Sequence, residues 1–395
     1  MEEERLERLR GRLMEEMSPE NAEEDAEIMR KITVLVAEEH QRSPMPLAER
    51  SRLAQELFSA VRGLGILQEL VDDPEVTEIM VNGPERVFVE KEGRIQRWER
   101  KFASEEALMD LVRQIAGRCD RVINEQSPVV DARLPDGSRV CAVIPPVSLA
   151  GAALSIRKFP DEPITMDGLV RLGTISREAA DFLTLLVRSG YSVLIGGGTS
   201  AGKTTFLNAL SACIPKGERV ITVEDNAELR LQGLENLVRL EAKSSNLEGA
   251  SEITIRDLVR ASLRMRPDRI VVGEVRGGEA IDLLQTLNTG HDGSLSTIHA
   301  NSAEDMISRL EMMALMAFPL PLPAIRRQIS SGVEVMCHLK RNRFGKRHVT
   351  EIVETDGMSG ENVRLRTLFA WDDAAGCLRK TGELLHAEKL FLVTR

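Results

Sequence analysis

The chain has 395 residues, enough for two or three domains of ordinary size, and 42% of them are hydrophobic, which is sufficient for a packed core. A formal net charge of −10 and an aromatic share of only 3% argue against nucleic-acid binding, which needs basic surfaces and rings that stack on bases. The five cysteines form no C-x-x-C pair, which argues against a structural zinc site and favours a reducing compartment. Because no apolar run reaches the roughly 18 residues of a membrane helix, we expect a soluble, cytoplasmic protein without an integral membrane segment.

Residues 1–70 are predicted to form an N-terminal helical region. Leu6, Leu9 and Leu13 recur at helical spacing, and after a break at QRSPMPLAER the pattern resumes over 47–64. This pattern favours a helical appendage with solvated charged faces, and a role in docking a partner fits it as well.

Residues 71–159 are predicted to form an α+β domain. VTEIMVNGPERVFVEKEGRI alternates like two short strands joined by an Asn-Gly-Pro turn, and a helix is expected over 104–117. RLPDGSRVCAVIPP is typical of a hairpin closed by Asp-Gly. The stretch PDEPITMDG, at 160–168, is predicted to be a linker.

Residues 169–395 alternate between strands and helices. Such alternation predicts an α/β domain with a parallel sheet and helices on both faces. Thr254 and Asp257 are spaced for a capping box, and Ser302 is expected to cap a second helix with Asp305 at its third position. The strands are predicted at 191–197, 219–225, 270–273 and in GSLSTIHA, and the helices at about 203–213, 254–263 and 279–288.

GGTSAGKT, at 197–204, has the Walker A spacing of a phosphate-binding loop, with a strand before it and a helix after it. Its backbone N–H groups and the positive end of the helix are expected to bind phosphate, and Lys203 adds a point charge. The Thr204 hydroxyl can reach Mg²⁺, and ATP is the expected nucleotide because no N-K-x-D guanine reader is present. The predicted nucleotide-binding residues are Gly197, Gly198, Thr199, Ser200, Ala201, Gly202, Lys203, Thr204 and Thr205.

Two carboxylate sites are expected to flank the γ-phosphate. In RPDRIVVGEVRGGEA, Gly273 stands where such a strand usually delivers an aspartate to magnesium, and Glu274 follows it. Glu224, beside Asp225, ends another strand, so its side chain belongs to the same carboxyl edge of the sheet. We expect Lys203, Glu224 and Glu274 to be catalytic. Glu274 is favoured on the metal, directly or through a water, and Glu224 on the attacking water, while the reverse assignment stays open.

Two histidines lie in GHDGSLSTIHAN. His299 follows a predicted strand and precedes a capped helix, which brings it to the same edge of the sheet, where a neutral imidazole could sense the γ-phosphate. His291 is a second candidate for this role. A hydrogen-bonded structural histidine is the alternative for both.

GGTSAGKTT, TVEDNAEL, VVGEVRGGEA and TGHDGSLSTIHAN resemble, in this order, the Walker A, Asp box, Walker B and His box of the traffic ATPases of type II and type IV secretion and pilus assembly. DPEVTEIMVNGPERVFVEKEGRI and RLPDGSRV resemble the N-terminal domain of that family, so the resemblance covers roughly 70–395. The absent zinc-binding cysteine quartet, VNGP and TEIVETDGMSGENVRLRTLF make the chain look most like the Tad/Flp pilus assembly ATPases of the CpaF type. Ser200-Ala201 replaces the frequent Gly-Ser of the family, and little consequence is expected because both residues are small.

The resemblance implies a RecA-like P-loop ATPase domain, a preceding PAS-like α+β domain and a homo-hexameric ring. It also implies that nucleotide binds between the two domains and that arginines of the first domain contact its phosphates. Arg133, Arg139 and Arg157 occupy the matching hairpin and linker region, with ordinary surface basicity as the alternative. Arg276 also matches the family and could contact a neighbouring subunit rather than the nucleotide.

The sequence therefore predicts an ATP-hydrolysing, Mg²⁺-dependent hexameric motor that powers Tad/Flp pilus assembly or retraction, or type II/IV secretion. Its expected partners are platform proteins of the inner membrane, where the cytoplasmic motor would be held. A DNA-translocating ring is disfavoured by the acidic balance, and a non-hydrolysing nucleotide-dependent scaffold by the two carboxylate sites. The alternative of a small-molecule kinase is disfavoured because the sequence shows no region that would bind a phosphate acceptor. Cargo and direction of the stroke are left open.

Overall fold

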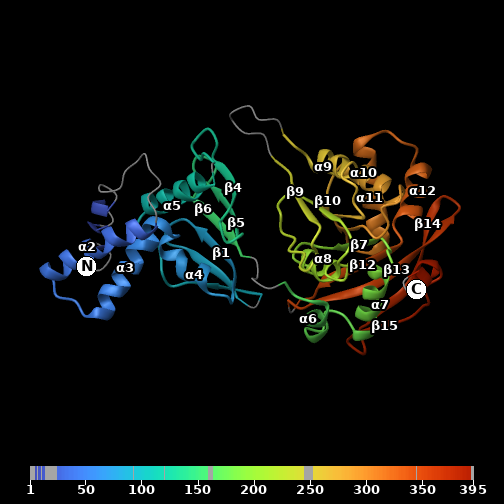
Figure 1. The fold of residues 1–395 in the computed structure, drawn as a ribbon, viewed down its shortest axis with the longest axis horizontal. Helices are drawn as coiled ribbons and strands as arrows, with labels where there is room; N and C mark the ends of the chain where they lie inside the picture. Colours follow the sequence, from blue (N-terminus) through green and yellow to red (C-terminus); the bar gives the residue numbers. More distant parts are fainter. Residues whose placement is uncertain are drawn as a thin grey trace. The chain divides into compact units, whose positions relative to one another are not determined.

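The computed structural model describes residues 5–6, 8–9, 11–13, 25–91, 93–119, 121–158, 163–243, 252–343 and 345–392. The chain divides into two compact units, Met1–Asp161 and Glu162–Arg395 (Figure 1), and each unit has its own hydrophobic core. Among the described helices, none combines the length and the hydropathy of a membrane span.

The first unit joins a small helical core to an antiparallel sheet. Leu9 and Leu13, which the periodicity of the sequence singles out, are fully buried with Ile32 and Leu57 of the two following helices. The strand order of the sheet is β3-β2-β1-β6-β5-β4. The elements are α2 (Asp25–Arg42), α3 (Leu47–Arg62), η1 (Gly65–Leu67), α4 (Gln68–Asp72), β1 (Val76–Asn82), β2 (Val87–Lys91), β3 (Arg94–Arg97), α5 (Glu105–Arg118), β4 (Val129–Arg133), β5 (Arg139–Val143) and β6 (Ala153–Arg157).

The first unit confirms the predicted α+β mixture but corrects one detail. The segment that the sequence predicts to hold two strands holds three, β1, β2 and β3. All residues of β3 are exposed, so this edge strand has no buried face and shows no hydrophobic alternation. Gly93, with φ of 74°, lies in the tight turn that leads into it.

The second unit is built on a mixed sheet of order β15-β14-β13-β12-β7-β11-β10-β8-β9. The strands from β12 to β9 run parallel, whereas β12, β13, β14 and β15 form an antiparallel extension. The elements are α6 (Met166–Arg171), α7 (Arg177–Arg188), β7 (Val193–Gly197), α8 (Lys203–Ser211), β8 (Val220–Glu224), β9 (Leu237–Glu241), α9 (Ile255–Ser262), β10 (Arg269–Val275), α10 (Glu279–Leu287), β11 (Leu295–His299), α11 (Ala303–Ala317), α12 (Leu322–Gly332), β12 (Val335–Arg341), β13 (Arg347–Ser359), β14 (Asn362–Asp372), β15 (Cys377–Lys380) and η2 (Glu388–Leu392).

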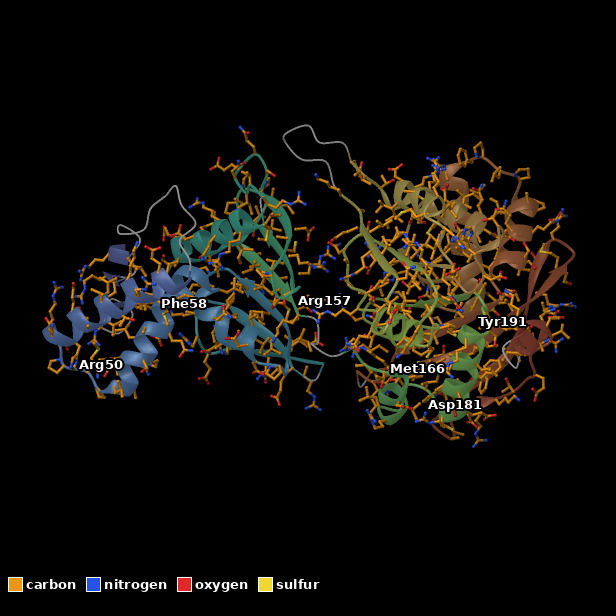
Figure 2. All side chains as sticks on the ribbon, in the orientation of Figure 1. Arg50, Phe58, Arg157, Met166, Asp181 and Tyr191 are labelled. Atoms are coloured by element: carbon orange, nitrogen blue, oxygen red, sulfur yellow. The ribbon has the colours of Figure 1, made fainter. Side chains whose placement is uncertain are left out.

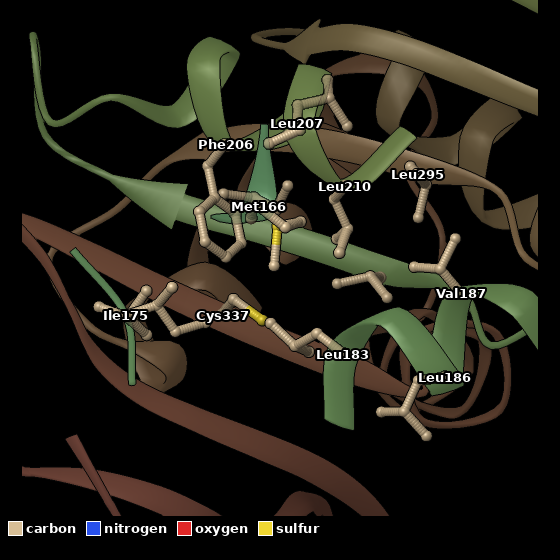
Figure 3. Close-up of a cluster of buried hydrophobic side chains, with 14 of the residues drawn as sticks. Met166, Ile175, Leu183, Leu186, Val187, Phe206, Leu207, Leu210, Leu295 and Cys337 are labelled. Carbon is tan, nitrogen blue, oxygen red and sulfur yellow. The ribbon is translucent and has the colours of Figure 1, made fainter. Parts of the chain in front are cut away.

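Helices cover both faces of this sheet, as the alternation of the sequence predicts. Residues of α7 and α8 pack on one face, where Figure 3 shows Leu183, Phe206 and Leu210 in one cluster with Cys337 of β12. Helices α9 to α12 pack on the other face. The arrangement brings the carboxyl ends of β7, β8, β10 and β11 to one edge, where loops can build a site.

Local signals in the sequence set several helix boundaries. Thr254 and Asp257 form the predicted capping box of α9, and Ser302 caps α11. The predicted linker at 160–168 lies partly outside the described residues, and its last three residues already belong to α6, which Thr165 caps.

Candidate nucleotide-binding site

The phosphate loop connects the end of β7 to the start of α8. Gly197 packs so tightly against β12 that an added Cβ would lie 2.6 Å from the backbone oxygen of Leu339. Gly202 has φ of 95° and serves as the N-cap of α8, a conformation that favours glycine. Lys203 and Thr204 then start the helix, whose first N–H groups have no partner within the helix and are suited to an anion.

Ser200 departs from the expectation of little consequence. Its φ is 58°, in the left-handed region, where a residue with a Cβ costs about 1 kcal/mol relative to glycine. The side chain of Arg347, from the start of β13, donates from Nε to the Ser200 backbone oxygen at 3.0 Å. A residue 147 positions away in the sequence thus contacts the most strained part of the loop.

The Lys203 ammonium lies in a cluster of polar groups at the carboxyl edge. Its Nζ is 3.2 Å from Nδ1 of His299, 3.3 Å from the Gly198 backbone oxygen and 3.8 Å from Oε1 of Glu274. His299 brings Nε2 within 2.8 Å of the same Glu274 oxygen. A neutral ring can accept from the Lys203 ammonium at Nδ1. Burial, and after it the positive charge of Lys203, lowers the pKa of His299, which favours this neutral form.

Glu274 is held from its other side by Arg276. The guanidinium donates from Nη2 and Nε to Oε2 of Glu274 at 2.6 and 2.9 Å, and from Nη1 to Asp225 at 3.4 Å. Strand β10 runs on to Val275, so Glu274 lies within the strand rather than after it. Within this chain, Arg276 therefore contacts the carboxylate of Glu274 in β10 and that of Asp225, which follows β8.

The side chain of Glu224 leaves no room for a side chain at position 273, where an aspartate is expected and Gly273 is found. Strands β8 and β10 are neighbours, and a Cβ on Gly273 would lie 2.9 Å from Cγ of Glu224. The carboxylate is 2% exposed, and its Oε1 accepts from the backbone N–H groups of Glu228 at 2.9 Å and Leu229 at 2.8 Å. Its Oε2 is buried and has no hydrogen-bond partner among the described residues. Burial raises the pKa of Glu224 to about 7 despite the two backbone donors.

A cavity of about 290 Å³ opens beside the phosphate loop. Its position next to Gly202 and Thr205, and its mixture of apolar and cationic walls, suit the nucleoside part of a nucleotide. The walls come from α6, the loop, α8 and the β12–β13 turn, and include Ile164, Leu169, Leu172, Thr174, Phe206, Leu339, Lys346 and Arg347.

His291 lies outside the cluster around Lys203 in this chain, and the phosphate-sensing role predicted for it stays a prediction. It lies in the turn before β11, whereas His299 ends that strand. The neighbouring Asp292 packs beside Gly190, ahead of β7, with its Cβ 3.9 Å from the position of an added Cβ on that glycine. The length of β11 therefore separates His291 from the phosphate loop.

The predicted arginines of the first unit form a row across three strands. Arg133 pairs with Arg139, which pairs with Arg157, so the three residues are in register on β4, β5 and β6 (Figure 2 labels Arg157). Glu78 on β1 is opposite Arg157 and ends the row. Like charges in register are unfavourable by roughly 0.2–1 kcal/mol per pair, which an anion would offset.

The donor set fits a magnesium ion that takes most of its ligands from phosphate and water. The described residues contain no group of three or more His, Cys, Asp or Glu placed to hold a metal by themselves. Oε1 of Glu274 contacts His299 and Lys203 but forms no hydrogen bond with the described residues, and the same holds for the buried Oε2 of Glu224. Thr204 lies in the first turn of α8. Hard oxygen ligands of this kind suit Mg²⁺, which keeps several waters.

Comparison with known proteins identifies the family of this chain. Residues 60–367 match the family model for type II/IV secretion system proteins. A putative conjugal transfer protein of Mycobacterium tuberculosis is 37% identical over 334 residues, which covers 81% of this chain and 93% of that protein. The type IV secretion system protein PtlH of Bordetella pertussis is 35% identical over 311 residues, covering 72% and 91%.

Solved structures confirm the predicted fold. The pilus retraction motor PilT with bound ADP matches with a TM-score of 0.55 and 22% identity, over 75% of this chain and 84% of PilT. The ATPase DotB of Legionella pneumophila matches with a TM-score of 0.52 and 19% identity, over 73% and 79%. These likenesses support a RecA-like fold preceded by a smaller α+β domain.

Proposed function

Since the chain belongs to the type II/IV secretion system protein family, we propose that it is an ATPase that drives a secretion or pilus machine. The observation that carries the proposal is the convergence of Lys203, His299 and Glu274 at the phosphate loop, with the buried carboxylate of Glu224 on β8, the strand next to that of Glu274. Phosphoryl transfer needs an anchored phosphate, neutralised charge and an oriented nucleophile, and these groups match the three requirements.

The phosphate loop binds the triphosphate, and the adjoining cavity accepts the nucleoside. An incoming γ-phosphate competes with Glu274 for the Lys203 ammonium, so binding exchanges an internal ion pair for a contact with substrate. Arg276 retains Glu274 when Lys203 leaves it, because its two hydrogen bonds go to the other carboxylate oxygen. His299 contacts both Lys203 and Glu274, so its ring responds when Lys203 moves from Glu274 to the phosphate.

Glu224 is the proposed base that orients and deprotonates the attacking water. A carboxylate with a pKa of about 7 is close to the optimum for proton transfer near neutral pH, and its free Oε2 can accept a water. Thr204 and Glu274 would hold Mg²⁺, which neutralises phosphate charge when bound. Burial and hydrogen-bond partners therefore favour Glu224 as the base for the water and Glu274 as a ligand of the metal.

Several finer features are part of the proposal. The arginine row of Arg133, Arg139 and Arg157 contacts nucleotide phosphates, and the functional assembly is a homo-hexamer. The segment TEIVETDGMSGENVRLRTLF supports a Tad/Flp pilus machine as the system served, with inner-membrane platform proteins as partners and a cytoplasmic location at the membrane. The names of relatives in conjugal transfer and type IV secretion support the broader class.

The decisive experiment measures phosphate release by Lys203→Ala, with Lys216→Ala, an exposed lysine outside the site, as its control. We expect the first variant to lose ATP hydrolysis and pilus or secretion output, and the control to keep both. Normal hydrolysis by Lys203→Ala would refute the site. A wild type that releases no phosphate even with its membrane partners would favour a nucleotide-dependent scaffold.

A further inference from the structure

The antiparallel pair β12–β13 contacts the junction between β11 and α11. His338 of β12 is 5% exposed, and its Nε2 lies 3.3 Å from the backbone oxygen of Ala300, the residue after His299. Glu351 of β13 accepts the backbone N–H of Ala303 at 2.9 Å. Two side chains of this pair therefore bind the backbone on either side of the turn that follows His299.

A glycine allows His338 to reach across the phosphate-loop strand. His338 is in register with Gly196 of β7, and Gly196 is in register with Ile298 of β11. An added Cβ on Gly196 would lie 2.4 Å from Sδ of Met306, so a larger residue there would collide with α11. Because Gly196 has no side chain, the imidazole can pass over β7 and reach the backbone oxygen of Ala300, just after β11.

The hydrogen bonds define the state of the ring. A carbonyl oxygen only accepts, so Nε2 of His338 carries the proton. In the neutral ring, Nδ1, 2.6 Å from Oγ1 of Thr350, accepts the single proton of that hydroxyl, whose other acceptor is the His338 backbone oxygen at 3.1 Å. Burial lowers the pKa of His338, which agrees with a neutral ring. Ala300 is 3% exposed and its N–H donates to the Gly197 backbone oxygen at 3.4 Å, so His338 completes the anchoring of this residue.

We propose that His338 is a positioning residue for ATP hydrolysis, which holds the Ala300 carbonyl and thereby sets the His299 ring against Lys203 and Glu274. The inference rests on the proposed ATPase function and adds to it a contact from outside the four sequence boxes. Through His338, the antiparallel extension of the sheet is joined to the group that registers the γ-phosphate. Loss of the donor would leave a buried carbonyl unsatisfied and free the end of β11 to shift.

A pair of substitutions separates the two ring nitrogens. The amide nitrogen of glutamine reaches the place of Nε2, whereas that of asparagine reaches only the place of Nδ1. We expect His338→Gln to keep kcat within about threefold of wild type, and His338→Asn to lower it roughly 10-fold or more. Affinity for ADP should stay within about twofold in both variants, because the phosphate loop is untouched. Equal losses in the two variants, or a loss of ADP affinity that matches the loss of kcat, would overturn the proposal.

A double-mutant cycle with His299 tests the route of the effect. If His338 acts through His299, then His338→Leu should lower kcat strongly in the wild type but by no more than about twofold in a His299→Ala background. His348→Asn on β13, where the ring packs against Trp371 at 4.2 Å, is the matched control and should leave kcat unchanged. Additive effects of the two substitutions would refute the inference and leave the proposed function intact. A wild type without hydrolysis would refute both.

Discussion

Replacing Glu224 by glutamine should remove activity and change the pH dependence of stability. Glutamine keeps an oxygen for the backbone donors of Glu228 and Leu229 but cannot ionise. In the wild type, the folded pKa of Glu224 is about 7 against an ordinary value of 4.5. Between these two values the folded protein binds more protons than the unfolded chain, so the free energy of unfolding falls as pH rises through this window. The difference of the two pKa values corresponds to roughly 3 kcal/mol, since one pKa unit is worth about 1.4 kcal/mol.

The assay is denaturant unfolding of wild type and Glu224→Gln at pH 5 and pH 8. Titratable groups that both proteins share contribute equally to the pH dependence, so their contributions cancel. The free energy of unfolding of the variant relative to the wild type should therefore increase by roughly 2–3 kcal/mol from pH 5 to pH 8. Wild-type kcat should rise through pH 7, and the variant should lose about 10²–10⁴-fold in kcat without that rise. An identical pH dependence of unfolding in the two proteins would refute a raised pKa for Glu224. Retention of kcat would refute its role as the base.

Other substitutions test the remaining contacts. Gly273→Ala should displace Glu224, lowering kcat about 100-fold in a steady-state assay while nucleotide affinity changes little; unchanged kcat would contradict the close packing. Arg276→Lys should lower kcat roughly 10-fold or more, because an ammonium cannot reproduce the paired hydrogen bonds to Glu274. Ser200→Gly should relieve up to about 1 kcal/mol of backbone strain, measured by thermal unfolding. Arg347→Ala should weaken ATP binding in a fluorescence titration, and less so in the Ser200→Gly background, whereas equal weakening in both would argue against a restraint on the loop.

Features with a local physical cause could be predicted from the sequence. The phosphate loop is flanked by its strand and helix, and the caps at Thr254 and Ser302 lie where the residue spacing predicts them. The alternation of strands and helices also predicts that Glu274 and His299 meet at one sheet edge, because parallel strands place their carboxyl ends together. Each of these inferences needs only nearby residues and a topological rule.

Features that depend on distant partners could not be predicted in the same way. Arg347 and His338 contact Ser200 and Ala300 across large sequence separations, and neither belongs to a recognisable motif. His291 belongs to the same sequence motif as His299, yet the two histidines lie at opposite ends of β11. The motif alone does not show which of its residues come before the strand and which come at its end. Tertiary pairing, rather than local propensity, decides these positions.

The residues that break local rules gather at the phosphate site, and this pattern itself argues for function there. Ser200 adopts a left-handed backbone, and Glu224 buries a carboxylate oxygen without a partner among the described residues. Each arrangement lowers stability, so a chain under selection for folding alone would lose it through Ser200→Gly or Glu224→Gln. Both become useful once a triphosphate and a water are bound, since the loop then curls around phosphate and the free oxygen accepts the water. The contacts from Arg347 to the loop and from Arg276 to Glu274 are the means by which the fold tolerates this arrangement before nucleotide arrives.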